Sequence, residues 1–386
     1  MARLRHFRPI IKNAIEAKWG VSPLSSLFEI NETTELTAVQ GLLYVSSRLK
    51  PTIFEEVNDK RTKTEASTYY EDDIAYFAED ESGRIEIQFE DRDKMYERYK
   101  VMSTGMAMGF LGFQYERSIF RVTDLCFPGN IRAGGVPSVR RRVFLASCIG
   151  MSNDNFNFEK MRIILHYLRT EDVEDFILMG GLLPSEMSGP GPALERLNVL
   201  CNITKTRLVL VPSQQDPTSK VFPQKPLHRK MFESSNPVLL PNPSVLFIEG
   251  ARCLVSSGEN IKDLLKYFPC RPGDAQGHHS GTDRAPGDSA AHSVENFLDA
   301  MESVMNCQYM CPTSPDTLKS EPVGAEDPFI LREHCSMFFC GGAPEAGVRT
   351  MEGGTRLVAV PSFERSGSVM LFDTLASSYE LVLFEG

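Results

Sequence analysis

The sequence predicts a chain of mixed α+β and α/β class, with an N-terminal helix, a small five-stranded barrel and a larger α/β domain. Three patterns support this prediction. Apolar residues recur at helical spacing between residues 7 and 19, and five short segments with the alternation of strands follow them. Beyond residue 140, strand-like and helix-like segments alternate, which is the order that builds a sheet with a parallel core and helices on its faces.

The first predicted element is an amphipathic helix. Phe7, Ile11 and Trp19 share one face, and Gly20 is expected to end the helix. A helix of this length is unstable alone in water, so its apolar face must pack on the rest of the protein. We assign residues 1–28 to this N-terminal helical segment.

Five strands are predicted next, and we assign residues 29–130 to the barrel that they form. An OB-fold is the five-stranded option among small barrels. The polar stretch 58–68 is expected to be a mobile loop, and the segment 129–137, with its three glycines and one proline, to mark the domain boundary. The predicted strands are 36–46, 74–78, 84–89, 105–113 and 119–127.

Residues 131–386 are predicted to form the α/β domain, in which the last strands finish its sheet. The predicted strands are 143–149, 176–183, 208–211, the hairpin 245–256 with its turn at Glu249-Gly250, 337–340, 356–360, 368–372 and 380–384. The predicted helices are 158–168, 193–203, 261–268 and 294–305. Segment 270–292 has almost nothing to bury, so we expect a flexible insertion. It contains His278, His279 and His292, but no scaffold that would fix a metal geometry.

The composition is that of an ordinary globular protein. The chain has 386 residues, enough for one large domain or about two to three average ones, with 42% hydrophobic and 24% charged residues. No segment resembles a signal peptide or approaches the ~20 apolar residues that span a bilayer, so we expect a soluble, intracellular protein without membrane contact. The nine cysteines are scattered and odd in number, which favours reduced thiols over a disulfide framework.

The charge balance argues against extensive contact with nucleic acid. The net charge is −10, whereas proteins that bind polyanions usually carry a positive balance. Two basic clusters remain candidates for local contact, the first with Arg3, Arg5, Arg8 and Lys12 and the second at 140–142. Such clusters are more often solvated surface, and that interpretation is favoured for both.

Four strand-end loops have the frame of a metallophosphoesterase, in the right order, but lack nearly all of its ligands. Such an enzyme holds two cations ~4 Å apart with Asp, His and Asn side chains at successive strand ends. At those positions this chain has Cys148, Gly150, Gly181, Pro184, Gln214, Gln215, Asp216, Gly342 and Pro344. One carboxylate cannot hold two divalent cations. We therefore predict no catalytic residue, no metal and no other cofactor, and we expect Asp216 to cap a turn.

Several blocks of the sequence carry a family resemblance. They are Gly41–Tyr44, Leu49–Ile53, Val122–Pro128, Gln215–Pro217, Pro223–His228, Asn236–Pro237, Asn242–Pro243, Ser256–Asp263, Cys311–Leu318 and Asp327–Ile330. Together they resemble the B-subunit family of the replicative DNA polymerases alpha, delta and epsilon, and most closely its polymerase delta small (second) subunits. The resemblance runs from about Phe7 to the C-terminus, and its most specific parts are 312–318 and 327–329.

This resemblance implies an OB-fold joined to a calcineurin-like phosphoesterase α/β sandwich that has lost its metals. It implies a non-catalytic accessory subunit of polymerase delta in the nucleus. The implied partners are the cysteine-rich C-terminal domain of the catalytic subunit and a third subunit, with the sliding clamp reached indirectly and DNA bound at most weakly. It does not identify binding residues. The insertion 270–292 is not expected from the family.

Two other functions stay open from the residues alone. The first is an active metallophosphoesterase with unusual ligands. The second is an OB-type module that binds single-stranded DNA by stacking bases on aromatic side chains. Acidic residues surround the aromatic ones, so we favour core and partner contacts for them. The aromatic residues are Tyr44, Tyr76, Phe89, Phe110 and Phe120.

The cysteines also admit two interpretations. Cys307, Cys311, Cys335 and Cys340 could form a four-cysteine zinc site, although neither pair has the tight spacing of a zinc knuckle. Reduced thiols in the core are the favoured interpretation, because free cysteine is among the most buried residue types.

Overall fold

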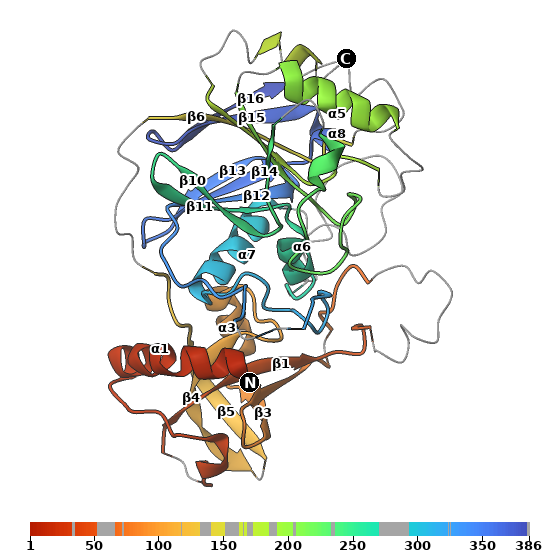
Figure 1. Cartoon of the computed structure of the whole chain (residues 1–386). Helices are drawn as coiled ribbons and strands as arrows, with labels where there is room; N and C mark the ends of the chain where they lie inside the picture. The colour runs from red at the N-terminus through yellow and green to blue at the C-terminus, as the bar shows by residue number, and fades with distance from the viewer. Residues whose placement is uncertain are drawn as a thin grey trace, which may run out of the picture.

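The computed structural model describes most of the chain. The described residues are 1–32, 35–51, 66–71, 73–116, 118–131, 140–150, 162–164, 166–167, 173–184, 191–203, 206–232, 236–269, 293–322, 324 and 326–383. The insertion 270–292 lies outside them, as do most of the predicted loop 58–68, most of the predicted helix 158–168 and residues 132–137 of the predicted boundary. In Figure 1 the barrel and α1 lie at the bottom, and two sheets lie above them.

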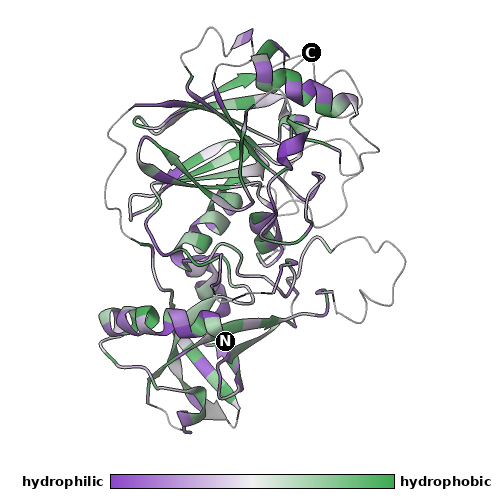
Figure 2. Ribbon diagram, viewed as in Figure 1, coloured by the Kyte–Doolittle hydropathy of each residue, from purple (hydrophilic) through white to green (hydrophobic). Residues whose placement is uncertain are grey.

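Helix α1 (Ala2–Trp19) confirms the predicted N-terminal helix and begins five residues before Phe7. It ends where Gly20 adopts the left-handed conformation and donates its N–H to Glu16 O. Leu4, Phe7 and Ile11 are fully buried, because this face of the helix packs on the barrel. Figure 2 shows apolar and hydrophilic residues within this same helix, as its half-buried position requires.

Five strands close into a barrel in the order β1-β2-β3-β5-β4. They are β1 (Thr37–Ser46), β2 (Ala75–Glu79), β3 (Arg84–Phe89), β4 (Ala107–Glu116) and β5 (Ile119–Cys126). The observed bounds differ from the predicted ones by at most two residues, except that β4 ends three residues later than predicted. Strand β1 pairs with both β2 and β4, and the parallel pair β3–β5 completes the closure. Every barrel strand therefore has two neighbours and no free edge.

A helix, α3 (Arg92–Tyr99), lies between β3 and β4, where the sequence pattern predicted none. Asp91 caps its N-terminus by accepting a hydrogen bond from Lys94 N at 3.0 Å. Only Met95 and Tyr96 of the helix are buried. The helix was missed because two buried positions in eight residues give no recognisable period.

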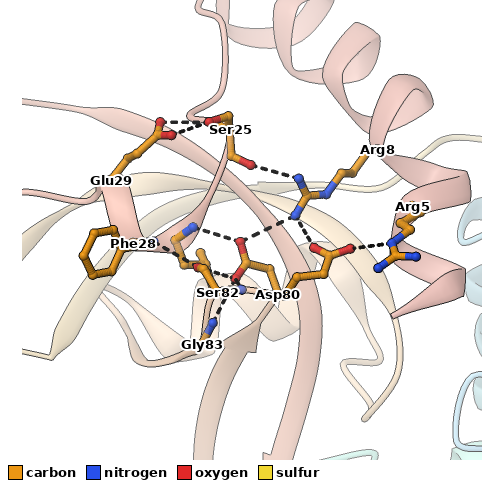
Figure 3. Close-up of polar contacts among 10 residues, drawn as sticks. Arg5, Arg8, Ser25, Phe28, Glu29, Asp80, Ser82 and Gly83 are labelled. Atoms are coloured by element: carbon orange, nitrogen blue, oxygen red, sulfur yellow. Dashed lines mark hydrogen bonds and ion pairs between the residues drawn. The ribbon is translucent and has the colours of Figure 1, made fainter.

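A network of polar contacts fastens α1 and the short helix η1 (Leu27–Glu29) to the β2–β3 turn (Figure 3). Arg8 pairs with Glu81 at 2.6 Å and with Asp80 at 3.5 Å. Asp80 in turn accepts hydrogen bonds from the N–H groups of Leu27, Ser82 and Gly83. Burial alone would raise the pKa of Asp80, but these donors outweigh it and hold the pKa below its usual value.

The larger part of the chain forms two stacked sheets, not one. The first has the order β16-β15-β6-β7-β8-β9, and the second has the order β10-β11-β12-β14-β13. The first comprises β6 (Arg142–Ser147), β7 (Asp175–Met179), β8 (Arg207–Val211), β9 (Val238–Leu239), β15 (Ser368–Asp373) and β16 (Ser378–Leu383). The second comprises β10 (Ser244–Ile248), β11 (Ala251–Ser256), β12 (Met337–Ala343), β13 (Gly347–Thr350) and β14 (Arg356–Pro361).

The prediction that the late strands finish one sheet is therefore wrong for β12 and β14. These strands run parallel to β11 in the second sheet, and β13, which was not predicted, pairs with β14. Ile177 and Val209 of the first sheet share a buried cluster with Phe339 of the second. The apolar packing between the two sheets decides which strand joins which sheet, because a continuously apolar strand can be buried equally well in either one.

Helices cover the outer faces of both sheets. Helix α5 (Pro192–Ile203) packs on the first sheet, whose core it shares through residues such as Leu197. Helices α6 (Glu259–Leu265) and α7 (Val294–Asn306) pack on the second. The short helix α8 (Phe363–Ser366), which was not predicted, precedes β15. Of the helices that the structure describes, none has the length and apolar character required to cross a bilayer.

The barrel and the second sheet share one hydrophobic core. A single cluster of buried side chains includes Phe7 of α1, Phe110 of the barrel, Tyr267 after α6 and Met301 of α7. In Figure 1, α6 and α7 lie between the sheets and the barrel. The predicted domains are therefore joined by extensive apolar packing as well as by the chain.

Candidate functional site

The predicted strand-end loops meet at the carboxyl ends of β6, β7, β8 and β12. Cys148 N donates to the carbonyls of Met179 and Gly180 at 3.2 and 3.0 Å, and Gly150 N donates to Gly181 O at 2.8 Å. Gly342 N donates to Ser147 Oγ at 2.6 Å, which brings the β12 loop to the same place. These bonds, together with that from Gly181 N to Ser213 Oγ at 2.8 Å, bring the four loops to one place. Two of the predicted ligand positions, Pro184 and Pro344, lie further along these loops and are half-buried.

The end of β7 shows why glycine stands where a metallophosphoesterase has a ligand. The predicted strand 176–183 is too long, because the structure ends β7 at Met179 and turns at Gly180 and Gly181, which have φ angles of 71° and 56°. A Cβ atom on Gly181 would lie 2.9 Å from Cys148 Cα and 3.1 Å from Gln215 Oε1. The space that a ligand side chain would need is filled by the neighbouring loops.

Asp216 is enclosed by the loop that carries it. Its exposed fraction is 0%, and its Oδ1 accepts the N–H groups of Leu182 and Leu183 at 2.7 and 2.8 Å. Its Oδ2 accepts from Ser213 N at 2.7 Å and from Ser213 Oγ at 2.9 Å. Burial raises the pKa of Asp216, and the four donors oppose that rise. The carboxylate therefore fixes the β8 loop against the β7 loop, in agreement with the expected turn-capping role.

Gln214 and Gln215 are likewise tied into the loops. Gln214 N donates to Glu259 Oε1 at 3.0 Å, and Gln215 N donates to Ser213 Oγ at 3.2 Å. Lys220 Nζ contacts the carbonyl oxygens of Gln214 and Asp216. The β8 loop is thus held by contacts within itself and by Glu259 of α6, and the positive charge beside Asp216 comes from a lysine of the same loop.

A buried amide beside these loops had no role assigned from the sequence. Asn242 is fully buried, and its Nδ2 donates to Gln224 Oε1 at 2.6 Å and contacts Ser257 Oγ. Ser257 N donates to Asn242 Oδ1 at 3.2 Å, and Ser257 Oγ contacts Glu259. The signal was available, because all these residues fall in the blocks or loops that carry the resemblance. The network connects the β8 loop to the start of α6.

The four cysteines considered for a zinc site are buried in the core. Among the described residues, no group of three or more His, Cys, Asp and Glu side chains is arranged to hold a metal ion. Cys307, Cys311, Cys335 and Cys340 are all described, buried and unpaired by disulfides, and they do not form such a group. Burial raises the pKa of Cys335 to about 11, so this thiol stays protonated at neutral pH. These side chains pack as core thiols.

The aromatic residues considered for base stacking are mostly inside the protein. Tyr76, Phe110 and Phe120 are 4%, 0% and 1% exposed, so they contribute to the core and have no free ring face for a base. Tyr44 and Phe89 are half-buried. The guanidinium of Arg84 already lies over the ring of Tyr44, 4.4 Å from its centroid.

The most specific block of the resemblance, 312–318, lies at the junction of the barrel with α6 and α7. Arg3 of α1 donates from Nη1 to Gly105 O at 2.7 Å and Pro312 O at 3.0 Å. From Nη2 it donates to Tyr309 OH and Ser314 O, both at 2.8 Å. Its guanidinium also stacks 3.8 Å above the Tyr309 ring. One side chain thus joins the helix, the barrel and the loop after α7.

The favoured interpretation of the first basic cluster as solvated surface is therefore wrong for Arg3. Arg8 is also engaged, through Glu81 and Asp80, whereas Arg5 is largely exposed. In the second cluster Arg140 pairs with Asp373 at 2.5 Å, and Arg141 pairs with Glu174 and Glu249. Both clusters are neutralised largely by contacts within the chain, which leaves little positive charge for nucleic acid.

Other contacts at the junction come from the same blocks. Lys50 is 7% exposed, forms an ion pair with Asp316, and donates to Val45 O at 2.7 Å. Thr317 Oγ1 donates to Asp263 Oδ2 of α6 at 2.6 Å. Asp327 of the second specific block accepts from Tyr309 OH at 2.9 Å, and so holds the ring on which Arg3 stacks. The residues that carry the resemblance hold the two parts of the chain together.

Two family matches together cover most of the chain. Residues 143–347 match the B-subunit family of DNA polymerases alpha and epsilon, and residues 1–125 match the OB-fold domain of the DNA polymerase delta subunit. The DNA polymerase delta small subunit of Saccharomyces cerevisiae is 26% identical, over 96% of this chain and 85% of its own length. DNA polymerase delta subunit 2 of Drosophila melanogaster is 21% identical, over 96% and 89%. The small subunit of Oryza sativa subsp. japonica is 22% identical, over 96% and 88%.

Proposed function

The chain belongs to the B-subunit family of DNA polymerases alpha and epsilon, and we propose that it is the non-catalytic small subunit of a nuclear DNA polymerase delta complex that acts in DNA replication. The family match spans 143–347, and relatives named as delta small subunits align with 96% of the chain. We further propose the division into 1–28, an OB-fold at 29–130 and a calcineurin-like phosphoesterase sandwich at 131–386.

The enclosure of Asp216 is the observation that carries the non-catalytic part of this proposal. A two-metal phosphoesterase needs carboxylate oxygens directed at the cations. Both oxygens of Asp216 are occupied by donors of its own and the neighbouring loop, and glycine or proline stands at five of the other ligand positions. The loops at the strand ends serve to shape the protein and not to hold a reacting phosphate.

The proposed role is to hold the catalytic subunit and connect it to a further subunit. We propose that the partner is the cysteine-rich C-terminal domain of the catalytic subunit, with a third subunit held elsewhere and the sliding clamp reached through these partners. The shared core and the contacts of Arg3 and Lys50 support this role, because they fix the barrel and the sheets relative to each other. A surface that spans both parts then keeps its shape without a partner.

Co-expression with the C-terminal domain of a polymerase delta catalytic subunit tests the proposal. We expect a stable one-to-one complex on size-exclusion chromatography with light scattering. A catalytic-subunit domain with its cysteines replaced by serine is the matched control and should not bind. A monodisperse chain that fails to bind the intact domain would contradict the proposal.

The phosphoesterase alternative makes the opposite prediction. If it is correct, Mn²⁺ should activate hydrolysis of bis(p-nitrophenyl) phosphate, and Asp216→Asn should abolish it in a protein that remains folded. We expect no hydrolysis above a buffer control containing the same Mn²⁺ concentration.

A further inference from the structure

The two stacked sheets have four edge strands, and three of them are protected. Strand β9 has two residues, and β13 has four and is covered by Arg349, which pairs with Glu295 and Asp299 of α7. In β10 the carbonyl of Phe247 already accepts a hydrogen bond from Arg207 Nη2 at 3.3 Å. Short strands and covering charges are the usual means by which proteins keep an edge from pairing with another chain.

Strand β16 lacks these protections. It is six residues long and, among the described strands, pairs only with β15. It forms the margin of the upper sheet, on the side of the molecule away from the barrel (Figure 1). No described segment pairs with its outer edge. Tyr379, Leu381 and Leu383 are 38%, 43% and 62% exposed. An edge of this length with exposed apolar side chains is a site where an additional strand is stabilised.

The register of β16 shows which face these side chains occupy. Leu381 is opposite Met370, and Tyr379 is opposite Phe372. Met370 and Phe372 are fully buried between the two sheets, and residues opposite each other in an antiparallel pair share a face. The apolar side of β16 therefore continues the inner face of the first sheet. Tyr379 OH donates there to Ala346 O, in the β12–β13 turn of the second sheet, at 3.4 Å, while Leu381 and Leu383 remain exposed.

The other face of β16 carries one charge. Glu380 has no ion-pair partner among the residues that the structure describes, although Arg140 and Arg141 lie in the same region. Those arginines are engaged with Asp373 and with Glu174. A pocket of about 350 Å³ opens beside Glu380. Its charged lining comprises the acids Glu174, Asp373 and Glu380 and the bases Arg140 and Arg142, so acidic groups are in the majority. It has room for a cationic side chain that approaches Glu380 from a neighbouring strand.

We propose that β16 is a docking edge that takes an extended strand from a partner polypeptide. The partner's alternate residues are apolar and cover Tyr379, Leu381 and Leu383, and a Lys or Arg between them pairs with Glu380. Backbone hydrogen bonds to the free edge provide affinity, and the alternation of apolar and basic residues provides specificity. The inference concerns the edge alone, so its failure leaves the proposed subunit function standing.

A designed peptide tests the proposal on the full chain. The probe is a fluorescein-labelled peptide of eight residues that alternates Ile with Lys, and its binding is followed by fluorescence anisotropy. We expect saturable binding that Leu381→Glu weakens at least tenfold. Phe247→Glu is the matched control, since it places the same charge at an exposed apolar residue of another edge strand, and it should leave the affinity unchanged.

The charge and the backbone are tested separately. Glu380→Lys should weaken binding of the Lys peptide and strengthen binding of a peptide that alternates Ile with Glu. N-methylation of alternate residues on the hydrogen-bonding edge of the Lys peptide should abolish binding. Equal binding of the N-methylated peptide, or of a peptide with the same composition in blocks, would overturn strand addition.

The oligomeric state decides between occupants. If the chain itself forms a concentration-dependent dimer that Leu381→Glu dissociates, the occupant is a second copy and the proposal is overturned. We expect Leu381→Glu to leave the oligomeric state and the thermal unfolding midpoint of the free chain unchanged, because Leu381 is 43% exposed.

Discussion

The strand-end loops and the junction each contain a charged side chain with several hydrogen bonds, fully buried in the loops and partly buried at the junction. These bonds reach very different distances along the chain. Asp216 contacts residues between 3 and 34 positions away. Arg3 contacts residues between 102 and 311 positions away. The first charge preserves the shape of one set of loops, whereas the second joins parts of the chain that the sequence keeps furthest apart. The region that resembles an active site is thus a local support, and the strongest family blocks serve long-range assembly.

Removing the carboxylate at the strand ends should give the largest loss of stability. Asp216→Ala leaves three buried N–H groups without an acceptor, and we expect it to lower the free energy of unfolding by about 3–5 kcal/mol. The midpoint of urea unfolding measures this loss. Glu321→Ala, at an exposed acid paired only loosely with Lys225, should change it by less than ~0.5 kcal/mol. Equal effects of the two variants would contradict a structural role for Asp216.

Removing the junction's cation should come next. Arg3→Ala deletes four hydrogen bonds and a stacking contact, and because Arg3 is only partly buried we expect a loss of about 2–4 kcal/mol. Arg5→Ala is the matched control two residues away, since its side chain is 72% exposed and pairs with Glu81 alone. Hydrogen exchange should show faster opening at 309–318 in Arg3→Ala only. Unchanged exchange there would show that the apolar core alone holds the junction.

The far end of α1 offers a smaller, pH-dependent effect. Burial opposes ionisation of Asp124, but hydrogen bonds from Lys18, Tyr99 and Trp19 outweigh it and lower its pKa to about 2. An unfolded Asp has a pKa of ~3.9, so the folded state favours the carboxylate and gains stability above that pH. This contribution, about 1–2 kcal/mol after allowance for partial exposure, is lost as the pH falls from 4 to 2. In Asp124→Asn the same pH interval should show a correspondingly smaller decline in thermal midpoint.

The smallest expected effect is that of a metal. A cation whose dissociation constant for the folded chain is 100-fold below its concentration in the experiment would stabilise the chain by about 2.7 kcal/mol. We expect 1 mM Mn²⁺, and equally EDTA, to leave the thermal midpoint unchanged. If Mn²⁺ raises the thermal midpoint and Asp216→Asn removes this rise, the strand-end loops bind a cation. They would then be more than the local support that distinguishes them from the junction.

Much of the secondary structure could be predicted because it follows from local periodicity. The stripe of Phe7 and Ile11 and the stop at Gly20 defined α1, and alternation defined the barrel strands. The turn at Glu249-Gly250 is where the hairpin β10–β11 turns. Helix α3 was missed because it buries only two side chains. Strand β7 was predicted to be too long because Leu182 and Leu183 are apolar, although they follow the turn.

The convergence of the loops after β6, β7 and β8 could also be predicted, because parallel strands in βαβ order place their carboxyl ends at one edge of a sheet. The loop after β12 comes from the second sheet, so its position does not follow from the order of the strands. The enclosure of Asp216 by the strand-end loops could not be predicted. Whether Asp216 faces a cavity or its own loop depends on the positions of the Leu182 and Leu183 N–H groups, which lie more than 30 residues earlier. No residue type or spacing encodes that choice.

By itself, the sequence determined most of the helices and strands, the order of the loops and the family to which the blocks belong. The tertiary structure decided how the strands divide between two sheets and what the blocks do. Arg3 and Pro312 lie 309 residues apart, and their contact leaves no period, motif or charge run in the sequence. Such distant residues meet only because β12, β14, α6 and α7 share a hydrophobic core with the barrel. Burial of this whole core stabilises each contact at the junction, including that of Arg3 with Pro312.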